Sequence, residues 1–245
     1  MRSLHEKKNR AETGLFLAEG TKVATELLQS DWKVRELYAR ERWLDQSAGL
    51  LARHPNLDCY PVSEKELSRI SAFKSPNEVI CVAEMPDAGD PGSPDDGLSL
   101  VLDSVRDTGN LGTIIRLADW FGIARIICSP DCADRFNAKV VQATMGSIFR
   151  VPVFIADLPE LLAAWRQQQP DVALYGAVMQ GDNIYEQSLP AQAAIVLGNE
   201  AHGISQAVLD QLTHNVTVPA FGGAESLNVG LAAAVICSEF RRPRT

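Results

Sequence analysis

Short apolar runs separated by helical patterns fill the last 150 or so positions of the chain. Each run is bounded by Gly and polar residues, which is typical of a buried strand. Between the runs, apolar residues recur on one helical face, as with Ile114, Leu117 and Phe121. Alternating strands and helices predict an α/β layer fold. We expect strands at 98–102, 125–128, 151–154, 172–176, 194–197 and 216–218, and helices at 113–121, 137–145, 158–168, 205–212 and 226–240.

The N-terminal part shows the same alternation on a smaller scale. Residues 1–13 are polar and predict a helix or an arm. Ser63, followed three residues later by Glu66, is a capping-box signature that starts a helix. This part therefore predicts a small α/β layer fold of its own. We expect strands at 15–18, 34–39, 59–62 and 78–85, with further helices at 21–28 and 43–52.

Residues 86–97 interrupt the pattern. They contain three prolines, three glycines and no large apolar side chain. Such a composition is typical of a linker, and a long loop inside one domain is the less favoured alternative because such loops are uncommon. We therefore predict one domain at 1–90 and a second at 98–245.

The composition narrows the class of protein. Hydrophobic content of 46% and charged content of 22% fit a soluble globular chain. The start of the chain lacks the apolar core of a signal peptide and no run is long enough to cross a membrane, so we expect a cytoplasmic protein. The five cysteines include no C-x-x-C pair and the four histidines are scattered, so no metal site is predicted.

The net charge of −8 argues mildly against nucleic-acid binding, because a phosphate-binding surface usually has a basic footprint. Net charge averages over the whole surface, however. The first ten residues carry Arg2, Lys7, Lys8 and Arg10 against Glu6 alone. A local basic patch therefore remains open.

A first candidate constellation joins Asn110 and Arg116. Asn110 is expected near the start of a helix, and Arg116 lies six residues on, nearly two turns along an otherwise apolar helix. The ordinary interpretation is a helix-capping Asn and an Arg paired with a surface acid. The functional interpretation is an Arg that binds a phosphate or lowers the pKa of a hydroxyl.

Two further constellations follow apolar runs near the C-terminus. Gly198 would let the backbone approach a ligand, and Glu200 next to it could bind RNA, orient Arg116 or cap the following helix. Ser226 is a plausible helix N-cap, and Asn228 in the first turn could reach a ligand. Polar loops after buried strands are where α/β folds bind ligands.

Three common enzyme motifs are missing. The chain has no G-x-G-x-x-G after the first strand of either domain, no Walker A motif and no G-x-S-x-G. These absences argue against a nicotinamide dehydrogenase, a P-loop enzyme and an α/β-hydrolase.

Taken together, the constellations resemble the three motifs of the SpoU (TrmH-type) family of RNA 2′-O-ribose methyltransferases. Because separate motifs occur in order over nearly the whole chain, the resemblance is specific. Residues 138–147 also look like the family, and 7–10 with 16–20 resemble its small substrate-binding domain of the L30e/L7Ae type. The motif matches are 110–116, 195–204, and 218–219 with 226–229.

The resemblance implies a SPOUT fold, which is a parallel α/β sheet with a deep trefoil knot. It also implies S-adenosylmethionine as methyl donor, and a homodimer with composite active sites. Arg116 is then the expected catalytic arginine, which contacts the phosphate or 2′-hydroxyl of the target RNA. Asn110, Glu200, Ser226 and Asn228 are expected to position RNA, Arg116 and cofactor, and the expected cofactor contacts are Ala177, Gly198, Asn199, Val218, Leu227 and Asn228.

Two positions depart from the family pattern. Thr108 stands where a proline is common, and Gly230 stands where a serine is common. Both departures concern loop rigidity and fine positioning rather than the chemistry. Ribosomal RNA is the preferred target on family analogy. The alternatives are transfer RNA, a non-catalytic RNA-binding protein, and a nucleotide-dependent enzyme acting on small metabolites.

Overall fold

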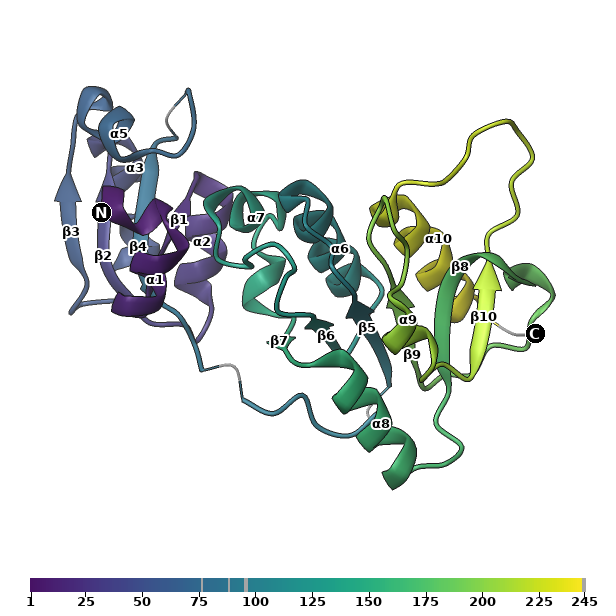
Figure 1. Cartoon of the computed structure of the whole chain (residues 1–245). Helices are drawn as coiled ribbons and strands as arrows, with labels where there is room; N and C mark the ends of the chain where they lie inside the picture. Colours follow the sequence, from purple (N-terminus) through teal and green to yellow (C-terminus); the bar gives the residue numbers. More distant parts are fainter. Residues whose placement is uncertain (76, 88, 95–96, 244–245) are drawn as a thin grey trace. The chain divides into compact units, whose positions relative to one another are not determined.

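The computed structural model describes residues 1–75, 77–87, 89–94 and 97–243 and divides the chain into two compact units (Figure 1). Unit 1 comprises 1–87 and 134–150, and unit 2 comprises 88–133 and 151–245. The division near residue 88 falls in the expected linker. Residues 134–150, which follow a strand of unit 2 in the chain, group with unit 1. The functional boundaries at 1–90 and 98–245 stay a prediction.

Unit 1 is built on a four-stranded sheet in the order β1-β4-β2-β3. The strands β1 and β2 run antiparallel to β4, and β2 runs parallel to β3. Its strands are β1 (Leu15–Glu19), β2 (Val34–Ala39), β3 (Asp58–Pro61) and β4 (Val79–Glu84), and its helices are η1 (Arg2–His5), α1 (Lys7–Thr13), α2 (Thr21–Gln29), α3 (Glu41–Gln46), α4 (Ala48–Leu51), α5 (Glu64–Ile70), α7 (Ala138–Ala143) and η2 (Ser147–Phe149).

The capping box predicted at Ser63 is present. The Ser63 hydroxyl accepts a hydrogen bond from the Glu66 amide, and the Glu66 carboxylate accepts one from the Ser63 amide. The single helix predicted at 43–52 is wrong, because the structure has two short helices there, α3 and α4, which meet at Ser47.

Unit 1 also includes an aromatic cluster that joins its two chain segments. The rings of Phe16 and Phe136 lie 4.9 Å apart, and those of Trp32 and Phe149 lie 5.2 Å apart. Nearby, the nearly buried guanidinium of Arg10 pairs with Asp134. These contacts explain why 134–150 belongs to the same compact unit.

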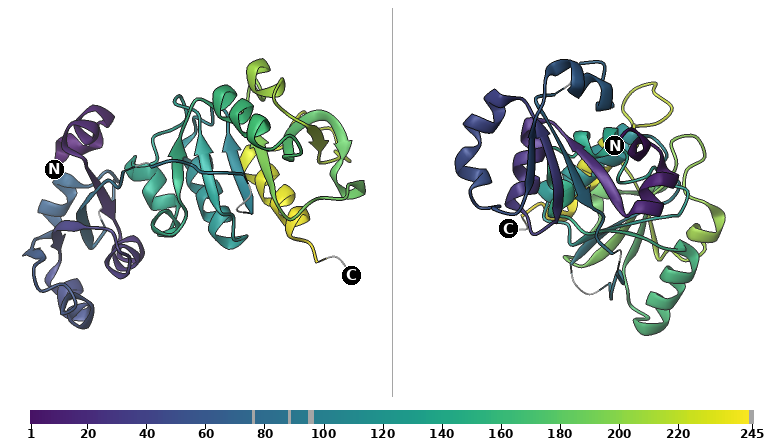
Figure 2. Two further views of the ribbon diagram at one scale, coloured as in Figure 1. Left: turned by 90° about the horizontal axis from the view of Figure 1, so that it is seen from below. Right: turned by 90° about the vertical axis from the view of Figure 1, so that its left-hand side faces the viewer.

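Unit 2 contains a six-stranded sheet in the order β10-β8-β9-β5-β6-β7, and all its strand pairs are parallel. Helices α8 and α9 pack on one face, whereas α6 and α10 pack together on the other (Figures 1 and 2). The elements are β5 (Leu98–Leu102), α6 (Thr108–Trp120), β6 (Arg125–Cys128), β7 (Val153–Ile155), α8 (Leu158–Gln168), β8 (Leu174–Asn183), η3 (Ile184–Glu186), β9 (Ala193–Leu197), α9 (Gln206–Leu209), β10 (His214–Thr217) and α10 (Val229–Arg241).

The central strands are buried on both faces, which is why they read as continuous apolar runs. Every residue of β5, β6 and β9 is buried. On the α8 side, Trp165 and Leu162 pack with Val101 and Val196 of these strands. The predicted α/β class is confirmed, with a parallel sheet of the kind that the resemblance implied.

Several element boundaries differ from the prediction. Helix α6 begins at Thr108 instead of 113, and α10 begins at Val229 instead of 226. The helix predicted at 205–212 is shorter, and the strand predicted at 172–176 extends to Asn183. Within the described part of the chain, no helix is both long and apolar enough to cross a membrane.

Candidate active site

The strand order has a switch point beside β5. From β5 the chain continues to its neighbour β6 and then to β7, whereas β9 and β8 lie on the other side of β5. The connections that leave β5 and β9 therefore diverge, and open α/β sheets bind ligands at such a switch point, outside the carboxyl ends of the strands. Asn110 follows β5, and Glu200 follows β9.

The loop after β5 enters helix α6 earlier than expected. Asp107 is the N-cap, and its carboxylate accepts a 2.8 Å hydrogen bond from the Asn110 amide. Asn110 is therefore inside the first turn, and its interpretation as a helix cap is wrong. The polar, glycine-bearing stretch reads as a loop, but the Asp107 side chain supplies the acceptor that a helix start needs. Thr108 is the first helical residue, where the common proline would be favoured but is not required.

A chain of side-chain hydrogen bonds links the three motifs. The Asn228 amide nitrogen donates to the Asn110 side-chain oxygen over 3.0 Å. The Asn110 amide nitrogen then donates to the Glu200 carboxylate over 2.6 Å. Residues 118 and 90 positions apart in the chain thus meet at one point.

The direction of this chain is fixed by helix α10. Asn228 is its N-cap, and the Asn228 side-chain oxygen accepts from the amides of Gly230 and Leu231 at 3.0 and 3.3 Å. That oxygen is therefore committed, so the amide nitrogen has to face Asn110. The capping role considered for Ser226 is wrong, because Asn228 fills it.

Gly230 allows the close approach of α10 to this network. A Cβ at Gly230 would lie 3.2 Å from the Asn228 side-chain oxygen and 3.4 Å from the Thr113 methyl group. The first contact is tighter than ordinary packing, and the second is at its lower limit. The glycine that departs from the family pattern therefore sits where the first turn of α10 meets α6.

Arg116 lies farther along α6 and is exposed. Among the residues that the structure describes, none accepts a hydrogen bond from Arg116 or forms an ion pair with it. The prediction that it pairs with a surface acid is therefore not met here. Within the described part of the chain no hydrogen bond joins Arg116 to Asn110 or Glu200 either, so its guanidinium is available to a substrate.

The loop after β9 folds tightly back on itself. Asn199 and Gly203 exchange two backbone hydrogen bonds of 2.9 Å, and Gly203 has a φ of 71°. A Cβ at Gly198 would overlap the backbone of Gly203 and Ile204. Gly198 is thus needed for the turn itself, whereas the sequence suggested that it makes room for a ligand.

The backbone groups at the predicted cofactor contacts are open. Gly198 is buried, yet no hydrogen bond among the described residues uses its backbone amide or carbonyl. The backbone groups of Val218, which is half-buried directly after β10, and of Leu227, which is exposed directly before Asn228, also make no hydrogen bond among the described residues. Buried backbone groups normally have partners, so the unpaired backbone of Gly198 fits a bound ligand, and the other two are open to the same ligand.

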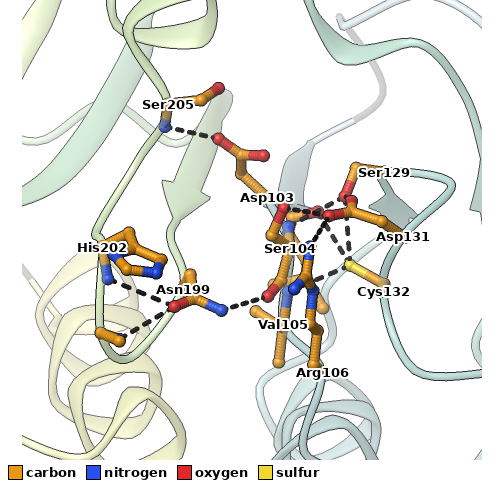
Figure 3. Close-up of polar contacts among 12 residues, drawn as sticks. Asp103, Ser104, Val105, Arg106, Ser129, Asp131, Cys132, Asn199, His202 and Ser205 are labelled. Atoms are coloured by element: carbon orange, nitrogen blue, oxygen red, sulfur yellow. Dashed lines mark hydrogen bonds and ion pairs between the residues drawn. The ribbon is translucent and has the colours of Figure 1, made fainter.

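The other predicted cofactor residues have different surroundings. Asn199 uses its whole side chain: it donates to the Ser104 carbonyl over 2.8 Å and accepts from the amides of Ala201 and His202 (Figure 3). Ala177 is half-buried on β8, and Ser226 is exposed. In the described part of the chain, no group of three or more His, Cys, Asp or Glu residues could hold a metal ion.

Comparison with models of known protein families identifies the family of this chain. The model of the SpoU rRNA methylase family matches residues 97–238, which is more than half of the chain. This chain belongs to the SpoU rRNA methylase family. Residues 1–81 also match the model of the MRM3-like substrate-binding domain. The resemblance predicted from the motifs is therefore confirmed.

Proteins with similar sequences match the chain over almost its full length. The 23S rRNA (guanosine(2553)-2′-O)-methyltransferase RlmP of Bacillus subtilis is 32% identical over 98% of this chain and 94% of its own. The 23S rRNA (uridine(2479)-2′-O)-methyltransferase of Streptomyces viridochromogenes is 29% identical over 98% of this chain and 87% of its own.

Solved structures of RNA methyltransferases share the fold of this chain. An RNA methyltransferase of the TrmH family from Porphyromonas gingivalis has a TM-score of 0.87 at 37% identity, and covers 98% of this chain and 95% of its own. The SpoU methyltransferase AviRb from Streptomyces viridochromogenes, solved with the cofactor AdoMet, has a TM-score of 0.85 at 26% identity, and covers 98% of this chain and 94% of its own.

Proposed function

We propose that this protein is an S-adenosylmethionine-dependent methyltransferase that modifies a ribose 2′-hydroxyl of ribosomal RNA. The observation that carries the proposal is the hydrogen-bond chain from Asn228 through Asn110 to Glu200, at the switch point of a SpoU-family sheet. Relatives named as 23S rRNA 2′-O-methyltransferases match the chain over nearly its full length, which supports the choice of ribosomal over transfer RNA.

The open backbone groups of Gly198, Val218 and Leu227 fit the adenosyl part of the donor. Backbone amides and carbonyls can recognise a nucleoside by hydrogen bonds without charged side chains, which suits loops that lack a glycine-rich phosphate motif. Bound there, S-adenosylmethionine supplies a methyl group on a positively charged sulfur, which makes that carbon an electrophile.

The side chains at this switch point then act on the RNA. A ribose hydroxyl is a poor nucleophile until its proton is drawn off, and a nearby guanidinium favours the alkoxide. We assign the stabilisation of the alkoxide to Arg116, whose guanidinium has no partner among the described residues. Because a guanidinium stays protonated, the hydroxyl proton itself leaves to water. One carboxylate oxygen of Glu200 accepts the hydrogen bond from Asn110, so the other oxygen is left for RNA or for Arg116. Ser226 contacts substrate from the exposed segment before Asn228.

We also propose a homodimer. Several large apolar side chains of unit 2 are exposed, and exposed apolar surface on a soluble protein commonly marks an interface. Four of them lie on or next to α6 and α10: Trp120 at the end of α6 (83% exposed), Leu231 on α10 (58%), and Phe221 (94%) and Leu227 (46%) in the segment before α10. Trp120→Glu is expected to give a monomer in analytical ultracentrifugation, and an unchanged sedimentation coefficient would contradict this interface.

Three further expectations follow from the resemblance. They are the deep trefoil knot in unit 2, the L30e/L7Ae type of the N-terminal domain, and composite active sites between the two subunits. We also place the protein in the cytoplasm, where its ribosomal substrate is made.

The decisive assay incubates the protein with methyl-labelled S-adenosylmethionine and protein-free bacterial large-subunit RNA. Nuclease-resistant, 2′-O-methylated dinucleotides are the expected product. Arg116→Ala should abolish transfer and leave donor binding by calorimetry intact. Arg166→Ala, which alters an exposed arginine on α8, is the matched control and should retain activity. No product with any ribosomal or transfer RNA, together with no donor binding, would instead indicate a non-catalytic RNA-binding protein.

A further inference from the structure

The turn between β5 and α6 is held by side chains that follow the neighbouring strand β6 (Figure 3). The Ser104 amide donates to the Ser129 hydroxyl over 2.9 Å, and the Val105 amide donates to the Cys132 sulfur over 3.3 Å. Backbone amides in such a turn would otherwise need water or a ligand. The segment after β6 thus binds the turn before it enters α6.

Asp131 is the centre of this arrangement. Its Oδ2 accepts from the Ser104 hydroxyl at 2.6 Å and from the Arg106 guanidinium at 2.7 Å. Its Oδ1 accepts from the Ser129 hydroxyl at 2.6 Å. The hydrogen bonds from Ser104, Ser129 and Arg106 hold the pKa of Asp131 well below its usual range. Three donors from two loops therefore converge on one carboxylate.

Ser104 adopts a backbone conformation that needs such support. Its φ is 58°, in the left-handed region that non-glycine residues avoid. Strained residues persist where the surroundings over-determine them. Here Asp131 binds the Ser104 hydroxyl from one side, and Asn199 binds its carbonyl over 2.8 Å from the other. Asn199 belongs to the same tight loop as Glu200.

The turn leads directly to the proposed active site. One residue beyond Arg106 stands Asp107, the N-cap whose carboxylate binds the Asn110 amide. The direction in which α6 leaves the sheet therefore sets where Asn110 meets Glu200. A small rotation of the turn would lengthen the 2.6 Å hydrogen bond between them.

We propose that Asp131 is a positioning residue for methyl transfer, because it holds Ser104 and Arg106 and thereby fixes the turn that presents Asn110 to Glu200. This inference rests on the proposed function. The alternative role is an exposed ion pair with Arg106, which would affect neither the turn nor the reaction.

The test compares Asp131→Asn with Asp210→Asn in the full-length protein. Asp210 is an exposed aspartate of unit 2 whose side chain accepts one hydrogen bond, from Gln206, so it is a matched control. In Asp131→Asn, hydrogen exchange should rise in a peptide covering 102–111 and stay unchanged in β8 and β10. The kcat for ribosomal RNA should fall by about 10- to 100-fold, because a displacement of a reacting or positioning group by about 1 Å lowers the rate by that factor. The KM for RNA and the donor Kd should change less than about twofold, and Asp210→Asn should match the wild type.

Unchanged exchange in 102–111, or a kcat equal to that of Asp210→Asn, would overturn the proposal. Should Asp131→Asn not fold, Ser104→Gly removes one of the three donors and accepts the left-handed backbone without strain, so it should fold and show the same changes in smaller degree. Ser104→Gly with wild-type exchange and kcat would overturn the proposal equally. The exchange measurement does not depend on activity, so an inactive wild-type protein refutes the proposed function and leaves the turn to be judged separately.

Discussion

Asn228 performs two tasks, and Asn228→Asp separates them. The side-chain oxygen of Asn228 caps helix α10, and its amide nitrogen donates to Asn110. An aspartate keeps the capping oxygen and adds a negative charge where a helix N-terminus favours one. It cannot donate a hydrogen bond, so the link to Asn110 is lost. Asn228→Ala, by contrast, removes both tasks.

The magnitudes follow from these contacts. Loss of the cap in Asn228→Ala should cost about 1 kcal/mol of unfolding free energy, and loss of the hydrogen bond to Asn110 about 1 kcal/mol more. In Asn228→Asp, the Asn110 side-chain oxygen faces a carboxylate that cannot donate to it, so the hydrogen bond between positions 228 and 110 is lost. If the Asn110 amide group instead rotates to donate to the new carboxylate, its oxygen faces Glu200 and the hydrogen bond to Glu200 is lost. A hydrogen bond to a charged group is worth about 1.5–3 kcal/mol, so transfer should slow by about 10- to 100-fold.

Thermal unfolding and single-turnover methyl transfer test this separation. Asn228→Asp should unfold within a few degrees of the wild type while its rate of transfer falls, and Asn228→Ala should lose both stability and rate. Donor affinity is measured beside them, since Asn228 is also a predicted cofactor contact. A wild-type rate in Asn228→Asp would refute the reasoning, as would equal destabilisation of the two variants.

Three further predictions concern the loops at the carboxyl ends of β5, β6 and β9. Ser104→Ala should lower the unfolding free energy by about 1 kcal/mol, because the hydrogen bond of the hydroxyl to Asp131 is lost. Ser104→Gly should leave the unfolding free energy nearly unchanged, because it also relieves about 1 kcal/mol of left-handed backbone strain. Chemical denaturation measures both variants, and a Ser104→Gly protein less stable than Ser104→Ala would contradict this account. Gly198→Ala should cost about 3 kcal/mol or more and abolish donor binding in calorimetry, since its Cβ would overlap the backbone of Gly203. The pKa of Asp131 is lowered from its ordinary value of 3.8, so the stability that its carboxylate contributes is present above that pH and lost as the pH falls through the lowered value. The difference in melting temperature between wild type and Asp131→Asn should therefore shrink below about pH 4, and a constant difference would exclude this linkage.

The fold could be predicted well from the sequence because its signals are strong and local. Strands buried on both faces read as apolar runs, so β5, β6 and β9 were found with boundaries near those observed. The start of α6 is predicted too late, at 113 instead of Thr108, because the polar, glycine-bearing stretch before it resembles a loop. The start of α10 is predicted too early, at 226 instead of Val229, because Ser226 resembles an N-cap. Only the tertiary structure shows that Asp107 and Asn228 supply the caps.

The site residues were found by their order in three motifs, but their partners could not be predicted. No local pattern indicates that Asn228 donates to Asn110, because that contact depends on how α10 packs against α6. Asp131 was missed altogether. It lies outside the motifs, and the only sequence signal was a polar stretch at the carboxyl end of a strand beside β5.

The last prediction asks whether Arg116 acts through its charge or through its shape. The acidic excess of the sequence lies in the segments of unit 2, whereas acidic and basic residues nearly balance in unit 1. A lone cation on α6 could therefore serve only to soften repulsion between unit 2 and RNA. In that case Arg116→Lys, which keeps the charge, should restore the wild-type rate.

If the guanidinium has to contact two oxygen atoms of the substrate at once, lysine cannot replace it. We expect Arg116→Lys to recover the binding affinity for RNA that Arg116→Ala loses, and to keep a kcat at least about tenfold below the wild type, since a charge-assisted hydrogen bond is worth about 1.5–3 kcal/mol. Full recovery of kcat by lysine would assign Arg116 to electrostatic attraction and move the activation of the hydroxyl to another group, with the free oxygen of Glu200 as the next candidate.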